Sequence, residues 1–392
     1  MFSAKAPKEN MFDISGLSYI SEKQHIRNPR TSLQENDVII STVGTIGNCA
    51  VITEDLLPAN SDRHVGIIRS KEISPYLIST FLLSKYGRMQ SLRNVVGNVQ
   101  PNLYIRDMKK FIFPYFPHSF QLQIERMVKE AHEKQTLSKQ LYKEAEELLL
   151  KELDLINYKP KHKLTFETTK KEVEQAKRFD SEYFQPKYDD IIKKIEEYEG
   201  GWDYVRNIFK FNKKNFFPKD NELYSYIPLS KVSNNGEIEI PEKELGKNLP
   251  TRARRKVKTG EVILSSISGS LETSALINEE HENFIVSNGF YVFKSNKINS
   301  ETLLVIFKSK FLLIILQRIS KGAILGGYDL TAFESCKIPI ISQPIQTQIS
   351  EKIQQSHKLR KESKELLELA KQKVEQEIEN ESKKYIKNKE TF

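Results

Sequence analysis

One long stretch constrains the fold of this chain more than any other: residues 120–156 contain neither proline nor glycine and carry an amphipathic pattern. Apolar residues recur three, four or seven positions apart along much of it, among them Ile124, Val128, Leu141, Ala145 and Leu149. Residues at this spacing form one apolar stripe on a helix, and charged residues occupy the other faces. The stretch therefore predicts a long helix that packs through one side.

A second stretch, residues 343–379, repeats the first at a constant shift of 225 positions. Ile349 falls on Ile124 and Val374 on Leu149, and no gap is needed. Two helices of similar length with matching stripes pack most simply against each other. At about 1.5 Å per residue, each helix would be on the order of 50 Å long.

The repeat continues into the region before each helix. Val262 matches Val38 at a shift of 224, and after one inserted residue the shift stays at 225, where Arg318 falls on Arg93. Matches that keep one register over a whole unit indicate an internal duplication. Residues 157–225 find no counterpart before Met1, so the first copy is expected to be shortened at its N-terminal side.

Each copy is expected to fold as an α+β domain, and the two domains to alternate with the two long helices. Alternating β-branched and small residues, apolar runs and helical spacing predict the individual elements. Strands are expected within 37–51, at 65–69 and at 111–117, and helices at 75–93 and 188–198. The expected organisation is a first domain at 1–117, a helix at 118–156, a second domain at 157–342, a helix at 343–385 and a basic tail at 386–392.

Composition places the chain among soluble globular proteins, because 38% of its residues are hydrophobic and 29% are charged. The formal net charge of +9 favours a polyanionic partner. Nucleic acid is preferred to membrane, because no basic amphipathic stretch carries exposed aromatic residues. The alternative is that the basic balance only reflects a lysine-rich proteome.

The two cysteines, Cys49 and Cys336, lie in β-like surroundings and are interpreted as buried residues of a reducing compartment. The most apolar segment, 311–316, is far too short to span a bilayer, and no signal peptide is recognised. We therefore expect a cytoplasmic protein.

The sequence carries no recognised catalytic motif. The sequence contains no GxGxxG motif after a strand, no Walker motif and no histidine pair at metal-ligand spacing. It also lacks the Asn or Asp, Pro, Pro, aromatic tetrapeptide with which adenine methyltransferases hold a flipped base. The expectation is a non-catalytic chain without cofactor or metal.

Three stretches carry a resemblance to a known family. FIFPYFPHSFQLQIERM and IPIISQPIQTQISEKI lead into the two long helices, and AKRFDSEYFQPKY precedes the second domain. Together with the two α+β domains, they resemble the specificity (S) subunit of type I restriction-modification systems over nearly the whole chain. The shortened first domain departs from this pattern.

The resemblance implies a function shared with partner subunits. Each domain would be a target recognition domain that reads one half of a split sequence in double-stranded DNA, and the helices would pack antiparallel as a spacer. The helices would also dock two adenine methyltransferase (M) subunits, which in turn recruit motor-nuclease (R) subunits. Self-association or a second specificity chain stays open as a way to complete a shortened first domain.

The densest basic segment of the second domain, TRARRKVK at 251–258, is expected to be a loop before a strand. Its cations are candidates for phosphate contacts, which anchor a protein on DNA without reading sequence. These candidates are Arg252, Arg254, Arg255, Lys256 and Lys258, and at a shift of 225 Arg27 falls on Arg252 and Arg30 on Arg255. The alternative is a solvated loop that is polar for solubility.

Candidates for base contacts are positions that differ between the copies, because the two domains should read different half-sites. At the shift of 225, Arg63 and His64 align with Asn288 and Gly289. Arginine can bond guanine and asparagine can bond adenine in a bidentate way, although unconstrained surface loops also diverge. Lys321 is a further DNA-contact candidate; it opens KGAILGG, which is not a phosphate-binding P-loop.

The apolar stripes suggest a partner surface near one end of the helices. The candidate partner-binding residues are Leu148, Leu149, Leu153, Val374 and Ile378, and packing of one helix on the other is the default alternative. Two other functional classes stay open beside a DNA-recognition subunit: a fused or related methyltransferase-nuclease system, and a coiled-coil scaffold without a DNA role.

Overall fold

The computed structural model describes residues 1–390 apart from 98, 234 and 323–325, and only the backbone of 384–390. The chain divides into two compact units. Unit 1 comprises Met1–Ser138 and His357–Phe392, and unit 2 comprises Lys139–Ser356. Helices α5 (His118–Glu152) and α12 (Gln343–Glu390) each contribute to both units. The side chains of the tail expected at 386–392 lie outside the described residues.

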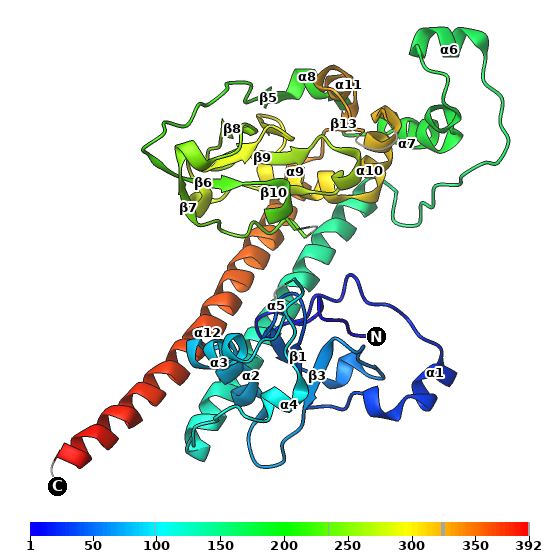
Figure 1. The fold of residues 1–392 in the computed structure, drawn as a ribbon. Coiled ribbons are helices and arrows are strands. Elements are labelled where there is room, and N and C mark those ends of the chain that lie inside the picture. The colour runs from blue at the N-terminus through cyan, green and yellow to red at the C-terminus, as the bar shows by residue number, and fades with distance from the viewer. Residues whose placement is uncertain (98, 234, 323–325, 391–392) are drawn as a thin grey trace. The chain divides into compact units, whose positions relative to one another are not determined.

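Both units combine helices with small sheets, as expected for an α+β fold (Figure 1). Unit 1 contains α1 (Glu22–Arg27), β1 (Val38–Ser41), β2 (Cys49–Val51), β3 (Val65–Ile68), α2 (Pro75–Leu83), α3 (Lys85–Arg93) and α4 (Ile105–Met108). Unit 2 begins with α6 (Lys170–Ala176), α7 (Pro186–Glu196), β4 (Trp202–Tyr204), α8 (Val205–Ile208), β5 (Phe209–Phe211), β6 (Leu223–Ile227), β7 (Lys243–Leu245) and β8 (Ala253–Lys256). It continues with β9 (Val262–Ser265), β10 (Ser274–Leu276), β11 (Ile285–Ser287), β12 (Phe290–Ser295), α9 (Ser300–Lys308), α10 (Lys310–Ile319), α11 (Leu330–Glu334) and β13 (Lys337–Pro339).

The sheets are small and mostly antiparallel. The described residues of unit 1 form a sheet ordered β2-β1-β3. Unit 2 has the sheets β10-β9-β12-β5 and β7-β6-β11-β8 and the pair β13-β4, and among its described strands only β6 and β11 pair in parallel. Strands β1 and β9 are buried along their whole length, and each lies between two neighbouring strands of its sheet.

The helix expected at 75–93 is two helices that meet at Ser84. The Ser84 hydroxyl donates to the Phe81 carbonyl at 2.6 Å, and its oxygen accepts from the Gly87 amide at 3.4 Å. A Cβ atom at Gly87 would lie 2.3 Å from the Phe81 carbonyl oxygen, so a larger residue there would force α3 away from α2. Ser309 forms the corresponding corner between α9 and α10, donating to Ile306 at 2.5 Å, with Leu312 at the position of Gly87.

In unit 1 the two long helices run antiparallel. Lys134 forms an ion pair with Glu362 at 2.7 Å, and the Ser363 hydroxyl donates to the Ala131 carbonyl at 2.7 Å. Their apolar stripes join the core beneath α2, with the members Ile124, Val128, Ala131, Leu367, Ala370 and Val374. The packing that the stripes predict is therefore confirmed here.

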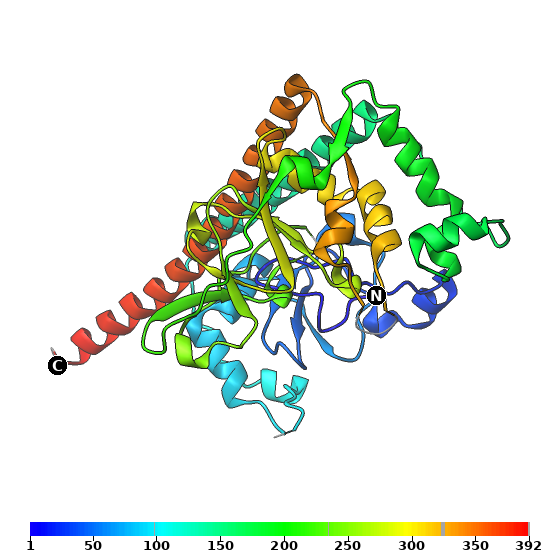
Figure 2. The same ribbon diagram turned by 90° about the horizontal axis from the view of Figure 1, so that it is seen from above.

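In unit 2 the helix segments also run antiparallel. Glu144 pairs with Lys352 at 2.5 Å, and the Ser342 hydroxyl, just before α12, donates to Glu152 at 3.2 Å. The buried stripe residues Ala145, Leu149, Leu153, Ile349 and Ile353 belong to the main core of this unit. Helix α12 continues beyond unit 2 and ends near the C-terminus marked in Figure 2.

The duplication extends to individual hydrogen bonds. In unit 1 the Gln121 side chain accepts from the Ser74 amide at 3.0 Å and donates to the Phe116 carbonyl at 3.1 Å. In unit 2 Gln346, exactly 225 positions later in the chain, accepts from Asn299 at 2.8 Å and donates to Ile341 at 2.8 Å. The same glutamine thus fastens the start of each long helix to its own domain.

The prediction of a strand at 111–117 is wrong, because these residues form no strand in the structure. Their counterpart in unit 2 is β13, which is a strand because it pairs with β4. Among the described residues of unit 1, β4, β5, α7 and α8 have no counterpart. The pairing partner, and not the local sequence, decides whether this apolar run becomes a strand.

Candidate nucleic-acid interface

The prediction that the basic segment 251–258 is a loop is wrong, because this segment contains a strand. Residues Ala253–Lys256 form β8, the edge strand of the sheet β7-β6-β11-β8. Ala253 and Val257 are buried, and Arg255 lies opposite Val286 of β11. Alternate residues of a strand point to opposite faces, so the cations of this segment do not form one surface.

Two of the cations stack on aromatic rings. The Arg254 guanidinium lies 4.8 Å from the centre of the Phe217 ring, and the Lys256 ammonium lies 5.5 Å from that of Phe216. The Phe216 amide donates to the Arg254 carbonyl at 2.8 Å, which fixes this aromatic segment along β8. Aromatic rings beside cations suit nucleic acid, because rings stack on bases while cations contact phosphates.

Sequence reasoning missed the two phenylalanines. They stand in KKNFFPK at 213–219, where aromatic residues interleave with lysines. Aromatic residues interleaved with lysines are the sequence signal that could have indicated a nucleic-acid-binding segment here.

Arg255 differs from its neighbours. Its guanidinium donates to the Asn215 side chain, and burial lowers the pKa of this guanidinium. It lines a small pocket with Asn212, Lys213 and Tyr291. A half-buried arginine held by an asparagine is a structural element of the domain more than a free phosphate contact.

Backbone hydrogen bonds bring several distant candidates together at one end of the unit 2 domain. The Asn288 amide donates to the Arg252 carbonyl at 2.8 Å, and the Ser266 amide to the Gly289 carbonyl at 2.9 Å. The Ser268 amide donates to the Gly326 carbonyl at 2.8 Å, and the Lys321 amide to the Gly327 carbonyl at 2.7 Å. We call this group of turns, residues 252, 266–268, 288–289, 321 and 326–327, the loop cluster.

The loop cluster depends on close backbone approach. A Cβ atom at Gly327 would lie 2.2 Å from the Ser266 carbonyl oxygen, so a larger residue there would force these two turns apart. Arg252, Asn288 and Lys321 are exposed, although Lys321 lies 3.6 Å from Asp329. Lys258 is also exposed, and its amide donates to Glu261 at 2.8 Å. Three candidates from separate parts of the sequence thus lie in one group of hydrogen-bonded turns.

Unit 1 builds the same turns. The Thr42 amide donates to the His64 carbonyl at 3.0 Å, and the Leu103 amide donates to the Thr42 carbonyl at 2.9 Å. Arg63 is exposed, and its Nε donates to His64 Nε2 at 3.1 Å. Arg63 and His64 therefore lie in the turn that corresponds to Asn288 and Gly289.

The proposed match of Arg27 to Arg252 and of Arg30 to Arg255 is wrong. The Leu33 amide donates to Ala59 at 2.9 Å, as Val257 does to Phe284 at 3.0 Å, so the register before the first strand is 224 and not 225. In that register Arg30 corresponds to Arg254. Arg27 ends helix α1, and Arg30 lies in a short 3-10 turn after it; both are exposed.

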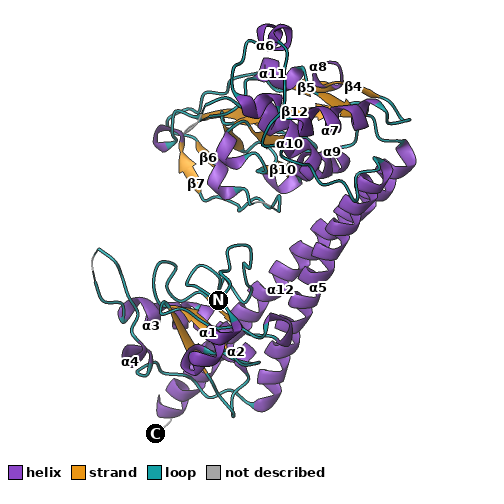
Figure 3. Cartoon of the chain, turned by 90° about the vertical axis from the view of Figure 1, so that its right-hand side faces the viewer, coloured by secondary structure: helices purple, strands orange, loops and turns teal. Residues whose placement is uncertain are grey.

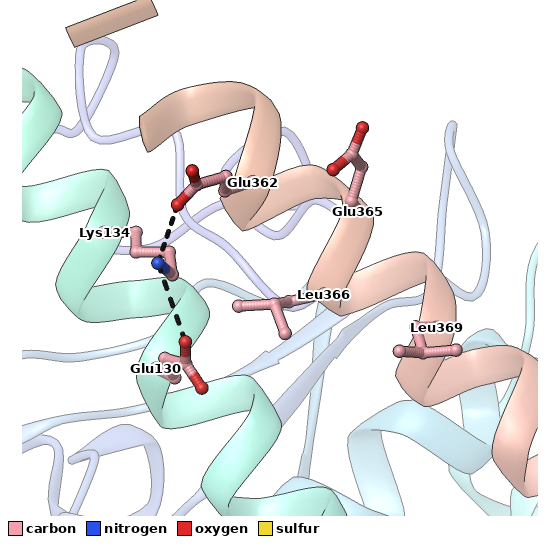
Figure 4. A pocket seen from close by; sticks show the side chains of 6 residues that line it. All are labelled: Glu130, Lys134, Glu362, Glu365, Leu366 and Leu369. Atoms are coloured by element: carbon pink, nitrogen blue, oxygen red, sulfur yellow. Dashed lines mark hydrogen bonds and ion pairs between the residues drawn. The ribbon is translucent and has the colours of Figure 1, made fainter. Parts of the chain in front are cut away.

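The candidate partner residues on the helices are largely core residues. Leu149 and Val374 are fully buried and Leu153 is 4% exposed. Leu148 and Ile378 are half-buried against the same cores. A groove that sequence reasoning missed lies on the helix pair of unit 1, lined by Glu130, Lys134, Glu362, Glu365, Leu366 and Leu369 (Figure 4). Leu369 is 44% exposed there.

Among the described residues, no helix is both long enough and apolar enough to cross a membrane. The two buried cysteines form no disulfide, and burial raises the pKa of each thiol to about 12.

Comparisons with protein-family models and with curated proteins gave no match. Solved structures do match. The S subunit of the type I restriction-modification system from M. genitalium is 13% identical over 88% of this chain and 83% of its own, with a TM-score of 0.44. The HsdS subunit from Thermoanaerobacter tengcongensis is 14% identical over 94% and 87%, with a TM-score of 0.29. A chain from a study of complex assembly and conformational transition of the type I R-M system is 12% identical over 94% and 87%, with a TM-score of 0.31.

Proposed function

We propose that this chain is the DNA-recognition subunit of a type I restriction-modification complex. It reads a split target in double-stranded DNA and directs adenine methylation and restriction by partner subunits, without catalysing either reaction itself. The complex acts in the cytoplasm. The observation that carries the proposal is the duplication: two domains in which several turns of the loop cluster correspond, each fastened in the same way to a pair of antiparallel helices.

The loop cluster supports the reading of DNA sequence. Arg63 in one copy and Asn288 in the other occupy the same turn, and both are exposed. Arginine pairs with guanine and asparagine with adenine through two hydrogen bonds, so the same turn would read a different base in each half-site. A conserved scaffold that carries different exposed polar residues is what a two-part reader requires.

The basic edge of unit 2 supports the anchoring of DNA. Arg252 is exposed and its carbonyl accepts from the Asn288 amide, while Arg254 and Lys256 of the adjoining strand β8 lie beside the rings of Phe217 and Phe216. Phosphate contacts set the position of a protein on the duplex, and base contacts set its specificity. The two kinds of residue lie next to each other in this domain.

The proposal of M and R subunits as partners rests on the sequence resemblance. M subunits are proposed to contact the exposed sides of the paired helices, because Leu149 and Val374 are already buried in the cores of their own units. R subunits would then join through M. In this proposal the chain recognises the DNA target, and its partner subunits catalyse the reactions.

The test is to sequence the methylome of cells that carry this chain with its cognate M subunit and of cells that carry M alone. A new adenine-methylated motif made of two separated parts is expected. An asymmetric motif means that both domains read DNA, whereas a palindromic motif means that one domain is used twice. No new methylation, despite a stable complex with M, would refute the proposal.

A further inference from the structure

The basic edge of unit 2 is not repeated in unit 1. Residues 252–258 carry five cations, whereas their counterparts in the register of 224, residues 28–34, carry only Arg30. In the proposed function both domains hold DNA, which requires cations against the phosphates. Unit 1 is therefore expected to carry its cations on a different element.

Helix α4 and its flanking residues show the opposite difference between the copies. Residues 104–110, which we call the α4 segment, contain one carboxylate and three cations, namely Arg106, Lys109 and Lys110. Their formal charge is +2. The counterparts at the shift of 225, residues 329–335, contain two carboxylates and no cation, which is a formal charge of −2. The segment is therefore basic in unit 1 and acidic in unit 2.

The two segments occupy corresponding places in their domains. A bridge between Val96 and Asn102 precedes α4, and a bridge between Lys321 and Gly327, each 225 positions later, precedes α11. Both helices are short and begin at the same position of the repeat. The difference in charge thus arises on one conserved element and not from a change of fold.

The α4 segment adjoins the turn that carries the base-contact candidates of unit 1. The Leu103 amide donates to the Thr42 carbonyl at 2.9 Å, and the Thr42 amide donates to the His64 carbonyl at 3.0 Å. Met108 of α4 packs against β3, where a Cβ atom at Gly66 would lie 3.5 Å from its sulfur. Figure 3 shows α4 at an outer side of unit 1. These contacts fix the segment beside the turn.

The cations of the α4 segment are exposed, although its backbone is fixed. The side chains of Arg106 and Lys110 are 77% and 68% exposed, and Lys109 is also exposed. Asp107, which is buried, accepts from Lys110 at 2.7 Å and lies 3.5 Å from Arg106. The Arg106 guanidinium lies 5.1 Å from the centre of the exposed Tyr104 ring. One carboxylate cannot neutralise three cations, so the segment presents positive charge beside an aromatic ring, as nucleic-acid-binding surfaces do.

We propose that the α4 segment is the DNA-anchoring element of unit 1, in which Arg106 and Lys109 contact phosphates of duplex DNA. Lys110 serves mainly to neutralise Asp107. The two domains then share corresponding turns but anchor DNA through different elements, the β8 edge in unit 2 and the α4 segment in unit 1. This inference rests on the proposed function, in which both domains bind DNA.

The test is a salt titration of fluorescence anisotropy with the full chain and two labelled duplexes of unrelated sequence. Arg106→Ala with Lys109→Ala removes two phosphate contacts, so the slope of log affinity against log salt concentration should fall by about 1.8 on both duplexes. Arg106→Lys with Lys109→Arg keeps both charges and should keep the slope. The matched control, Arg126→Ala with Lys361→Ala, removes one arginine and one lysine that are exposed on α5 and α12 and should also keep the slope.

Three results would overturn the inference and leave the proposed function standing. An unchanged slope for Arg106→Ala with Lys109→Ala, in a chain that binds DNA, means that unit 1 anchors DNA elsewhere. An equal loss in the control variant means that only net charge matters. A loss on one duplex alone means that these residues contact bases and not phosphates. Failure of the unchanged chain to bind either duplex at any salt concentration would instead refute the proposed function, and the inference with it.

Discussion

The basic edge of unit 2 allows a matched test of DNA anchoring, in which two pairs of cations are removed from opposite edges of one sheet. Arg252 and Lys256 lie at the β8 edge, and Lys243 and Lys247 lie in β7 and just after it. All four side chains are exposed, so replacing either pair by alanine should leave the fold intact. Each double variant lowers the formal net charge from +9 to +7.

The size of the effect follows from counterion release. Each phosphate contact contributes about 0.9 to the slope of log affinity against log salt concentration. Loss of two contacts should reduce the slope by about 1.8, which corresponds to binding that is roughly 60-fold weaker at 0.1 M salt when the affinities extrapolate to the same value at 1 M. The β7 variant should retain the original slope.

The assay is a salt titration of fluorescence anisotropy with a duplex that carries the methylated motif, and circular dichroism checks the fold of each variant. If the β7 variant loses as much affinity as the β8 variant, only net charge matters and the assignment of the β8 edge is refuted. An unchanged slope for Arg252→Ala with Lys256→Ala would refute it equally.

Three further predictions concern the scaffold. Leu149→Ala should reduce the free energy of unfolding in urea by about 2–5 kcal/mol, because Leu149 is fully buried. Leu164→Ala, at a side chain that is 95% exposed, should change this free energy by less than about 0.5 kcal/mol. Similar losses for the two variants would contradict the assigned core. Gln346→Ala should reduce the free energy of unfolding by about 1–3 kcal/mol, because it leaves the buried Ile341 carbonyl and the partly buried Asn299 amide without this partner. A loss below about 0.5 kcal/mol would mean that this link is not needed. Cys49 and Cys336, with a pKa of about 12, should react with Ellman's reagent at pH 8 only after unfolding, and rapid labelling of the native chain would argue against their burial.

The sequence predicts those features that are local or repeated. The helical stripes, the strands within 37–51 and the duplication were all visible, because each is encoded in spacing along the chain. The one-residue insertion was visible, since Val38 matches Val262 at a shift of 224, but the match of Arg27 to Arg252 used the shift of 225 that applies only after the insertion. Hydrogen bonds of Leu33 and Val257 place the register at 224 before the first strand.

Features that depend on a distant partner were harder to predict. Strand β8 is rich in cations, which favour solvent, and becomes a strand by pairing with β11 some 30 positions later in the chain. Residues 111–117 present the opposite case: they are apolar enough for a strand, but no strand in the described part of unit 1 pairs with them as β4 pairs with β13. The same limit applies to the site, since the contact between Arg252 and Asn288 arises from folding and not from sequence proximity.

The division of the chain into units has a consequence for biosynthesis. Unit 2 is one continuous stretch, Lys139–Ser356, so the ribosome has made all of it before it makes the last segment of unit 1. The core that contains Ile124 and Val128 is complete only after Leu367, Ala370 and Val374 have been synthesised. The domain that is translated first is therefore finished last, and during that interval its helix exposes an apolar stripe that a chaperone, or an early-binding partner, would have to shield.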